Sequence, residues 1–352
     1  MNSTKHVPYF DLARGMAILL VVLVHVEALG TNFRIYLVSF VLPVFFLVSG
    51  MLLSKTGSIK GDIFIFIKKR FGGIMVPYYL YSLLYLVVEY IYNRCNGSLA
   101  DWPWKQNLTD SLTLYGISVL WFLPVLFFGE ILMALLFQFC HERRILHIPI
   151  SAICIILLAG ISYFFSLKIP ANVHIWVMIF RIFLCLPFIG MGYYLYPRFQ
   201  AWHFTLRKEL FLGVVLLVIT LPLSQINGSV DVHSLLVSNV LLFYLSAFTG
   251  TLGVLFCCRL LEKIQYKAFI GKLIFYFLEF FGKNSLTVMV THVDFYLLYA
   301  STLIAISFID YVKHAKSYIF CASVWCMILL MELPIIWIVN HWLPLLTGKR
   351  KH

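Results

Sequence analysis

Long apolar runs separated by short polar segments repeat along almost the whole chain. A run of roughly 20 apolar residues is long enough for a helix to cross the hydrocarbon core of a bilayer. Because the short alternating segments of a membrane β-barrel are absent, the pattern predicts about ten transmembrane helices. The predicted spans cover residues 8–30, 34–54, 74–92, 117–139, 146–165, 174–196, 209–226, 234–258, 286–309 and 317–343.

The segment 264–283 has a different pattern. It is shorter than most of the predicted spans and carries Lys267, Lys272 and Glu279 among Phe and Tyr residues. Such a mixture is typical of an amphipathic helix that lies in the membrane interface. We therefore expect a single all-α membrane domain over residues 1–352, with the helices around a central cavity and this segment on the membrane surface.

The composition narrows the class of protein further. The 352 residues are 62% hydrophobic and only 12% charged, whereas an average soluble domain carries roughly 25% charged residues. This excludes a soluble globular enzyme, a disordered tail and a nucleic-acid-binding module. The net charge is +12, and with the N-terminus inside, the inner loops carry about three times as many Lys and Arg residues as the outer loops. This bias predicts two cytoplasmic termini and no nucleic-acid partner, because the basic residues are spread over every inner loop.

The first predicted span carries Arg14 near its start and His25 near its end. Their spacing places both side chains on one helix face, about 16 Å apart along the axis. Arginine binds phosphate through a planar fork, and histidine can take a proton from an alcohol. The pair therefore fits a long ligand with an anionic head, such as coenzyme A. A packing histidine with an arginine that reaches the interface fits the same spacing equally well.

Ionisable side chains at membrane depth are costly and usually face a protein interior or a water-filled cavity. Glu27 points about 200° away from His25 around the helix. Glu130 and Asp294 are therefore the expected carboxylate partners of this histidine, and Arg181 is expected to pair with one of them. The ionisable residues inside predicted spans are Arg14, His25, Glu27, Glu89, Glu130, Arg181, His292, Asp294 and Glu332.

Five short segments follow one another along the chain as recognisable motifs: Phe10–His25, Phe45–Leu53, Phe66–Tyr78, Leu120–Leu123 and Gly282–His292. In this order they resemble the motifs of the acyltransferase type 3 membrane family. The sub-pattern looks most like the stand-alone sugar O-acetylases, the fucose 4-O-acetylase-like branch. Members often carry a second arginine three residues after the position of Arg70, where this chain has Gly73, so Lys68 or Lys69 is expected to substitute or donor binding to be weaker.

The resemblance implies an enzyme that moves an acetyl group from cytoplasmic acetyl-CoA to a hydroxyl of a cell-envelope carbohydrate. The acceptor would be a surface polysaccharide or a lipid-linked glycan, and the protein would be a multi-pass protein surrounded by lipid in the bacterial inner membrane. His25 would act as general base or acyl carrier, assisted by Glu130 or Asp294. No metal is expected, because the eight cysteines show no metal-ligand spacing. Donor binding is expected at Arg14, Lys68, Lys69, Arg70 and Ser49, and the cavity lining at Trp121, Phe46, Arg181 and His292.

A transporter or flippase for a lipid-linked sugar or acyl intermediate is the main alternative. Kinked spans with buried charges suit that class as well. No inverted repeat is detectable, and transport leaves the Arg14 and His25 pattern without a purpose. A sensor or scaffold domain is a third possibility, disfavoured because no fused domain is visible in the sequence.

Overall fold

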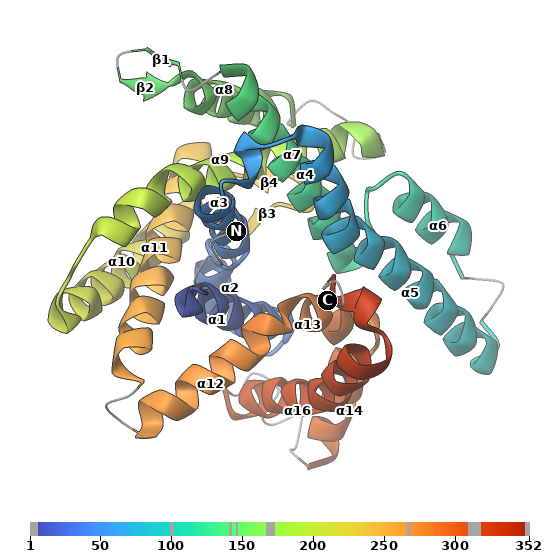
Figure 1. Cartoon of the computed structure of the whole chain (residues 1–352). Coiled ribbons are helices and arrows are strands. Elements are labelled where there is room, and N and C mark those ends of the chain that lie inside the picture. The colour runs from blue at the N-terminus through green and yellow to red at the C-terminus, as the bar shows by residue number, and fades with distance from the viewer. Residues whose placement is uncertain are drawn as a thin grey trace.

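The computed structural model describes residues 6–98, 102–140, 143–145, 147–166, 173–265, 269–308 and 318–348. This part of the chain is almost entirely helical, with two short hairpins (Figure 1). Several basic residues that enter the charge comparison above lie outside the described residues: Lys5, Lys168, Lys267, Lys313, Lys316, Lys349, Arg350 and Lys351.

Eight helical segments of the described chain are long and apolar enough to cross a membrane. The expectation of an all-α, polytopic membrane protein is thereby confirmed. The segments are α1 (Pro8–His25), α2 with α3 (Thr31–Val38 and Val41–Thr56), α4 with α5 (Ile63–Arg70 and Val76–Cys95), η3 with α7 (Ser118–Trp121 and Phe122–Cys140), α9 (His174–Ala201), α10 (Leu206–Asn227), α11 (Val240–Ile264) and α16 (Tyr318–Trp342).

Two of the predicted spans are not single long helices. The predicted span 146–165 corresponds to α8 (Ile150–Ser166), a shorter apolar helix. The predicted span 286–309 is divided into α13 (Ser285–Asp294) and α14 (Leu297–Phe308). Among the described residues, eight or nine segments are long enough to be a span, fewer than the ten that hydropathy predicts, because hydropathy alone does not show where a helix breaks.

The break between α13 and α14 has a backbone cause. Tyr296 has a φ of 62°, a left-handed conformation that cannot continue a right-handed helix. Its hydroxyl donates a hydrogen bond to the carboxylate of Glu89 on α5. At its other end α13 follows α12 (Phe269–Lys283) at a bend of 72°, and this bent pair would form a ninth span.

Helix α1 ends at His25, before the predicted end of its span at residue 30. Arg34 Nη2 donates to the carbonyl oxygens of Val26 and Glu27, at 2.9 and 3.3 Å. These bonds satisfy carbonyl groups at the point where the helix stops. Glu27, expected at membrane depth, lies exposed in the turn after the helix, and His25 occupies the last turn.

Short elements join the long helices. The π-helical turn η2 (Phe71–Met75) connects α4 to α5, and both hairpins are antiparallel, with Val230 opposite Val237 in the second. The remaining short elements are η1 (Ser58–Lys60), α6 (Trp104–Leu112), β1 (Arg144–Ile145), β2 (Ile148–Pro149), β3 (Val230–Asp231), β4 (Leu236–Val237) and η4 (Pro344–Thr347).

Helix α1 lies inside the bundle and packs against α3, α11, α12 and α13. Its crossing with α12 is very close, because a Cβ atom added to Gly15 would lie 2.0 Å from the carbonyl oxygen of Leu278. A Cβ atom on Gly282 would lie 1.8 Å from the carbonyl oxygen of Asp11. Glycines allow helix backbones to approach in this way in a membrane, so the start of α1 is held directly against the end of α12.

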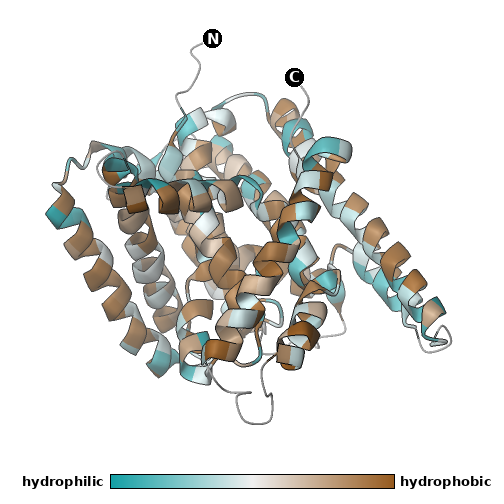
Figure 2. Cartoon of the chain, turned by 90° about the horizontal axis from the view of Figure 1, so that it is seen from below, coloured by the Kyte–Doolittle hydropathy of each residue, from teal (hydrophilic) through white to brown (hydrophobic). Residues whose placement is uncertain are grey.

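The two ends of the chain emerge at the same end of the bundle (Figure 2). Helix α1 starts there, and Gly348 after η4 packs onto the backbone of Gly73, next to the junction of α4 and α5. The hairpin of β3 and β4 follows α10 near the opposite end, where α1 finishes at His25. The bundle therefore has one end with both termini and one end with this hairpin.

The crossing of α3 and α9 gives a test of the packing. A Cβ atom on Gly192 would lie 2.0 Å from the carbonyl oxygen of Leu47, whereas Gly160 on α8 has no atom within 4 Å of its Cβ position. We expect Gly192→Ala to lower the free energy of unfolding by about 1–3 kcal/mol, measured by thermal unfolding in detergent. Gly160→Ala is the matched control. Equal unfolding temperatures for the two variants would contradict the close helix contact.

Candidate active site

Two pockets enter the bundle, one lined by Arg14 and the other by His25. The Arg14 pocket has a volume of about 280 Å³ and lies near the end with the termini, since Thr347 also lines it. The His25 pocket has a volume of about 490 Å³ and lies near the β3–β4 hairpin. One helix, α1, contributes a residue with candidate chemistry to each pocket.

The Arg14 guanidinium is held by groups of its own helix. Arg14 forms an ion pair with Asp11, one turn earlier, and its Nε donates to the carbonyl oxygen of Phe10 at 3.4 Å. Asp11 is buried and also contacts His6 Nε2 at 2.7 Å. This pairing compensates the cost of placing the carboxylate in the bundle and orients the guanidinium.

Arg70, Glu130 and Ser49 form a second ionic group in the same pocket. Arg70 Nε lies 2.8 Å from Glu130 Oε2, and the hydroxyl of Ser49 donates to Glu130 Oε1. Glu130 is only 2% exposed, so its charge depends on these partners. Three helices, α4, α7 and α3, are joined at this point. Because Arg70 uses Nε for the carboxylate, its terminal nitrogens are free for a ligand as far as the described contacts go.

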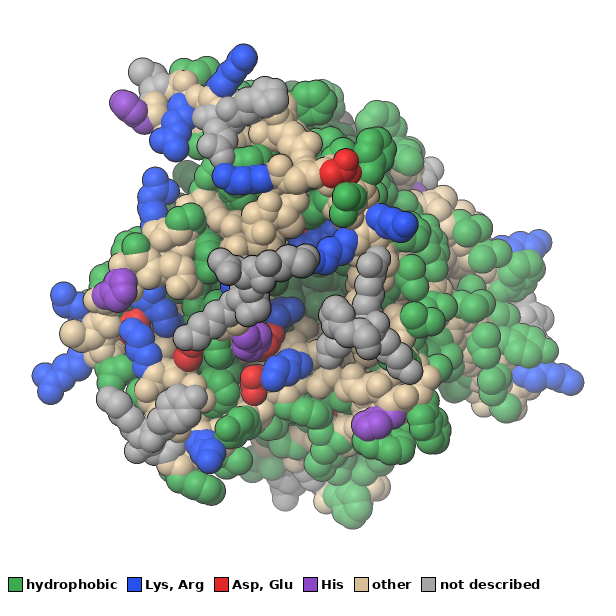
Figure 3. Space-filling model, viewed as in Figure 1, with side chains coloured by type: hydrophobic (Ala, Val, Ile, Leu, Met, Phe, Trp, Pro, Cys, Tyr) green, Lys and Arg blue, Asp and Glu red, His purple; other side chains and the backbone are tan. Residues whose placement is uncertain are grey.

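Lys68 and Lys69, which are expected to bind a donor, lie outside the described lining of the Arg14 pocket. Both are exposed, because Phe66 and Arg70 are one turn apart and share the face of α4 that packs inwards. Lys283, at the end of α12, lines the pocket instead. No spacing in the sequence pointed to it. Seen from this end, Lys and Arg side chains gather around a hollow, with acidic side chains among them (Figure 3).

His25 and His292 meet at the end of α1. His25 Nδ1 lies 2.8 Å from the carbonyl oxygen of Val21 and 3.3 Å from His292 Nε2, and His292 Nδ1 lies 2.8 Å from the carbonyl oxygen of Val288. A carbonyl oxygen only accepts, so Nδ1 carries the proton in both neutral rings. His292 Nε2 then accepts from His25 Nδ1, and His25 Nε2 is left unprotonated.

Neither carboxylate predicted as the partner of His25 contacts it among the described residues. Glu130 is engaged at the Arg14 pocket, and Asp294 is buried beside the hydroxyl of Ser118. Glu332 accepts from Thr291 Oγ1, the neighbour of His292, at 2.7 and 2.9 Å. The Val21 carbonyl group and the His292 imidazole therefore orient His25. A carboxylate was expected in this role.

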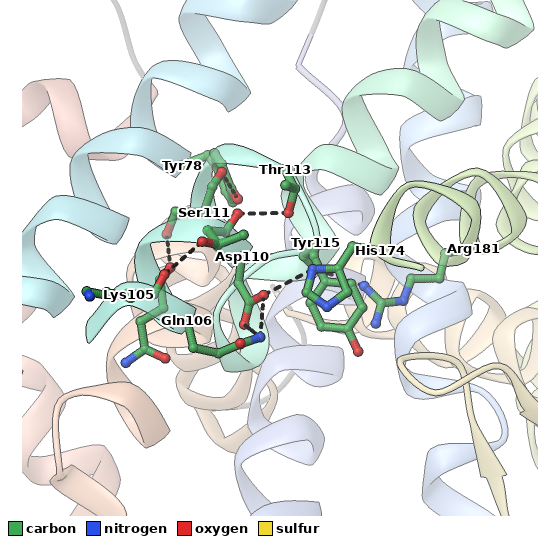
Figure 4. A network of polar contacts seen from close by, with 11 residues as sticks. Tyr78, Lys105, Gln106, Asp110, Ser111, Thr113, Tyr115, His174 and Arg181 are labelled. Carbon is green, nitrogen blue, oxygen red and sulfur yellow. Dashed lines mark hydrogen bonds and ion pairs between the residues drawn. The ribbon is translucent and has the colours of Figure 1, made fainter. Parts of the chain in front are cut away.

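Arg181 is completely buried, but it binds carbonyl groups rather than a carboxylate. Its Nε donates to the carbonyl oxygen of His233 at 2.7 Å, and Nη1 to that of Tyr115 at 2.8 Å. Figure 4 shows the guanidinium beside the Tyr115 ring, which stacks on His174, and His174 reaches Asp110 at 3.2 Å. Arg181 lies near the start of α9, too far along the bundle from Glu130 for the expected ion pair. Its two hydrogen bonds connect the loop at Tyr115 to the β3–β4 hairpin.

The two segments that Arg181 connects both contribute residues to the lining of the His25 pocket. Trp121, Asp231 and His233 line it together with Ser118, and the rings of Trp121 and His233 lie 5.8 Å apart between centroids. Phe46 is buried against the ring of Phe122 and is not among the described residues that line this pocket. Asp231 and His233 were not predicted, because a short loop far along the chain carries no pattern that links it to His25.

Comparison with known proteins identifies the family. Residues 7–341 match the family model described as an acyltransferase domain, Acyl_transf_3. The chain belongs to the acyltransferase 3 family. The match includes every residue named above for the two pockets except His6 and Thr347. Searches of curated proteins and of solved structures give no significant match.

Membership of the acyltransferase 3 family assigns the class of reaction. The chain is a multi-pass membrane protein with an acyltransferase domain, which implies the transfer of an acyl group. The transporter interpretation has no comparable support.

The pH dependence of stability tests the buried environment of His233, a residue of the β3–β4 hairpin. It lies outside the membrane-spanning segments, and burial together with the Arg181 guanidinium lowers the pKa of His233 to about 4, against roughly 6.5 for an unperturbed histidine. Below about pH 6.5 the unfolded chain binds a proton that the folded chain refuses, so stability falls towards pH 4. We expect the unfolding temperature to drop over this interval in the wild type.

His233→Gln removes this titrating group and keeps a neutral hydrogen-bonding side chain. We expect its unfolding temperature to depend less steeply on pH between 6.5 and 4 than that of the wild type. A variant at the exposed His203 is the control. Identical pH profiles for the wild type and His233→Gln would show that this residue is not held neutral.

Proposed function

We propose that the chain is a membrane O-acetyltransferase that moves an acetyl group from cytoplasmic acetyl-CoA to a carbohydrate hydroxyl. The observation that carries the proposal is the position of Arg14 and His25 on one helix, each lining a pocket that enters the bundle. Their separation of about 16 Å along α1 suits a donor with phosphates at one end and a thioester at the other.

The donor phosphates bind in the Arg14 pocket in this proposal. Arg14, Arg70 and Lys283 supply the cations, and guanidinium groups match the geometry of phosphate oxygens. Asp11 and Glu130 hold the two guanidinium groups in place before the donor arrives. The basic bias of the loops next to the termini places this pocket on the cytoplasmic side. In the same arrangement, α12 lies along the cytoplasmic membrane surface, and α13 enters the bundle after the bend of 72°.

His25 performs the proton transfer. Its Nε2 takes the proton of the acceptor hydroxyl while the oxygen attacks the thioester carbonyl carbon. The carbon–sulfur bond breaks, and the CoA thiolate recovers the proton from the imidazolium. Transfer through an acetyl-His25 intermediate balances equally. In both routes His292 Nε2 and the Val21 carbonyl accept from His25 Nδ1 and stabilise the positive ring.

The acceptor occupies the His25 pocket. Trp121 offers an aromatic face, and Ser118, Asp231 and His233 offer hydrogen-bonding groups near the pocket mouth, a combination that suits a ring with several hydroxyls. A surface polysaccharide or lipid-linked glycan of the bacterial inner membrane fits this site. Within the family, the fucose 4-O-acetylase-like branch is the proposed relative.

Removing the base tests the chemistry. His25→Gln keeps a polar side chain of similar size without the basic nitrogen, and we expect acetyl transfer to fall by about 10²–10⁴-fold. Mass spectrometry of surface glycans from cells with the wild-type and variant genes measures the loss of acetyl groups. His203→Gln is the matched control, since His203 Nδ1 also contacts a nearby carbonyl oxygen but is exposed. Full glycan acetylation with His25→Gln would refute the assignment.

Removing the guanidinium tests the donor pocket. We expect Arg14→Ala to weaken acetyl-CoA binding by about 10–100-fold, the loss of a charged hydrogen bond, measured by thermal shift or calorimetry on the purified protein. Arg14→Lys should restore only part of this affinity, because lysine lacks the planar fork. Arg198→Ala, an exposed arginine on α9 at the same end of the bundle, is the control. Unchanged affinity in Arg14→Ala would separate the donor from this pocket.

A further inference from the structure

Two described residues, Phe122 and Met289, line both the Arg14 pocket and the His25 pocket. Phe122 is the first residue of α7 and Met289 lies in the middle of α13. Each is 4% exposed. The two pockets therefore approach each other from opposite ends of the bundle and share a wall at these two side chains.

The two halves of this wall differ in stiffness. The ring of Phe122 packs between Phe45 and Phe46, at centroid distances of 5.8 and 4.8 Å, so its position is fixed by its neighbours. Methionine is unbranched and has several rotatable bonds, so Met289 can change conformation at little cost. Met289 also precedes His292 by one helical turn, which places it on the same side of α13 as the second imidazole.

We propose that Phe122 and Met289 form the constriction that selects the acyl group by its width. The inference rests on the proposed function, because it assumes a donor head in the Arg14 pocket and a base at His25. The acyl group is the leading end of such a donor, so it passes between the two side chains before the pantetheine arm does.

The cross-section of the leading group then decides which donors react. A linear acyl chain is no wider than the cysteamine end of the pantetheine arm, which follows it directly, so its extra length adds no barrier at this point. A chain branched next to the thioester is wider and has to displace either the packed ring of Phe122 or the side chain of Met289. The constriction therefore favours acetyl and other linear short chains over branched ones.

The experiment compares three donors with membranes from the protein's own cell, which contain the natural acceptor. Acetyl-CoA, n-butyryl-CoA and isobutyryl-CoA carry a labelled acyl group, and the label incorporated into glycan is measured for each variant. Phe122→Leu replaces the ring with a smaller side chain and so widens the constriction. Met289→Ala widens the same constriction from α13, and it is the alternative variant if Phe122→Leu does not fold. Phe137→Leu is the matched control, because Phe137 lies on α7 against Tyr193 and lines neither pocket.

We expect the rate with isobutyryl-CoA relative to acetyl-CoA to rise at least about tenfold in Phe122→Leu or Met289→Ala, the usual effect of one methyl group in a tight pocket. The n-butyryl ratio should change much less, and Phe137→Leu should behave as the wild type. An unchanged isobutyryl ratio in both wall variants, or an equal rise for the linear chain, would overturn the inference. Absence of acetyl transfer in the wild type would instead refute the proposed function.

Discussion

The backbones of α1 and α12 cross at Gly15 and Gly282 with no room for a side chain at either position. This contact brings Arg14 and Lys283, the sequence neighbours of the two glycines, into the lining of one pocket. It also sets the starting point of α13, which carries Met289 and His292 towards the other end of α1. The geometry of both pockets therefore depends on one helix crossing. Small residues such as these glycines are what allow membrane helices to approach so closely.

Several charged groups inside the described bundle have partners that also orient a group at a pocket. Asp11 holds Arg14 within α1, Glu130 on α7 holds Arg70 on α4, and the carbonyl groups bound by Arg181 join the loop before α7 to the β3–β4 hairpin. An unpaired charge at this depth would cost several kcal/mol. The contacts of Glu130 and Arg181 thus also connect segments that are distant in sequence.

His25 is not oriented by a carboxylate among the described residues. The carbonyl oxygen of Val21 and the Nε2 atom of His292 accept from Nδ1, which leaves Nε2 as the basic atom of the ring. These partners come from α1 itself and from α13, so the tautomer of the ring depends on how α1 packs against α13.

The sequence by itself determined the membrane class, most of the spans and the pairing of Arg14 with His25 on one helix, because hydropathy and helical spacing are local properties. The motif resemblance pointed to the family that the chain belongs to. Tertiary structure decided which helices break, as at Tyr296, and which partners meet across the bundle, as for His25 with His292 or Arg181 with the hairpin. It also decided that Lys283 rather than Lys68 or Lys69 faces the Arg14 pocket. These outcomes depend on which helix faces touch, and contacts between residues far apart in sequence leave no periodic signal in a single chain.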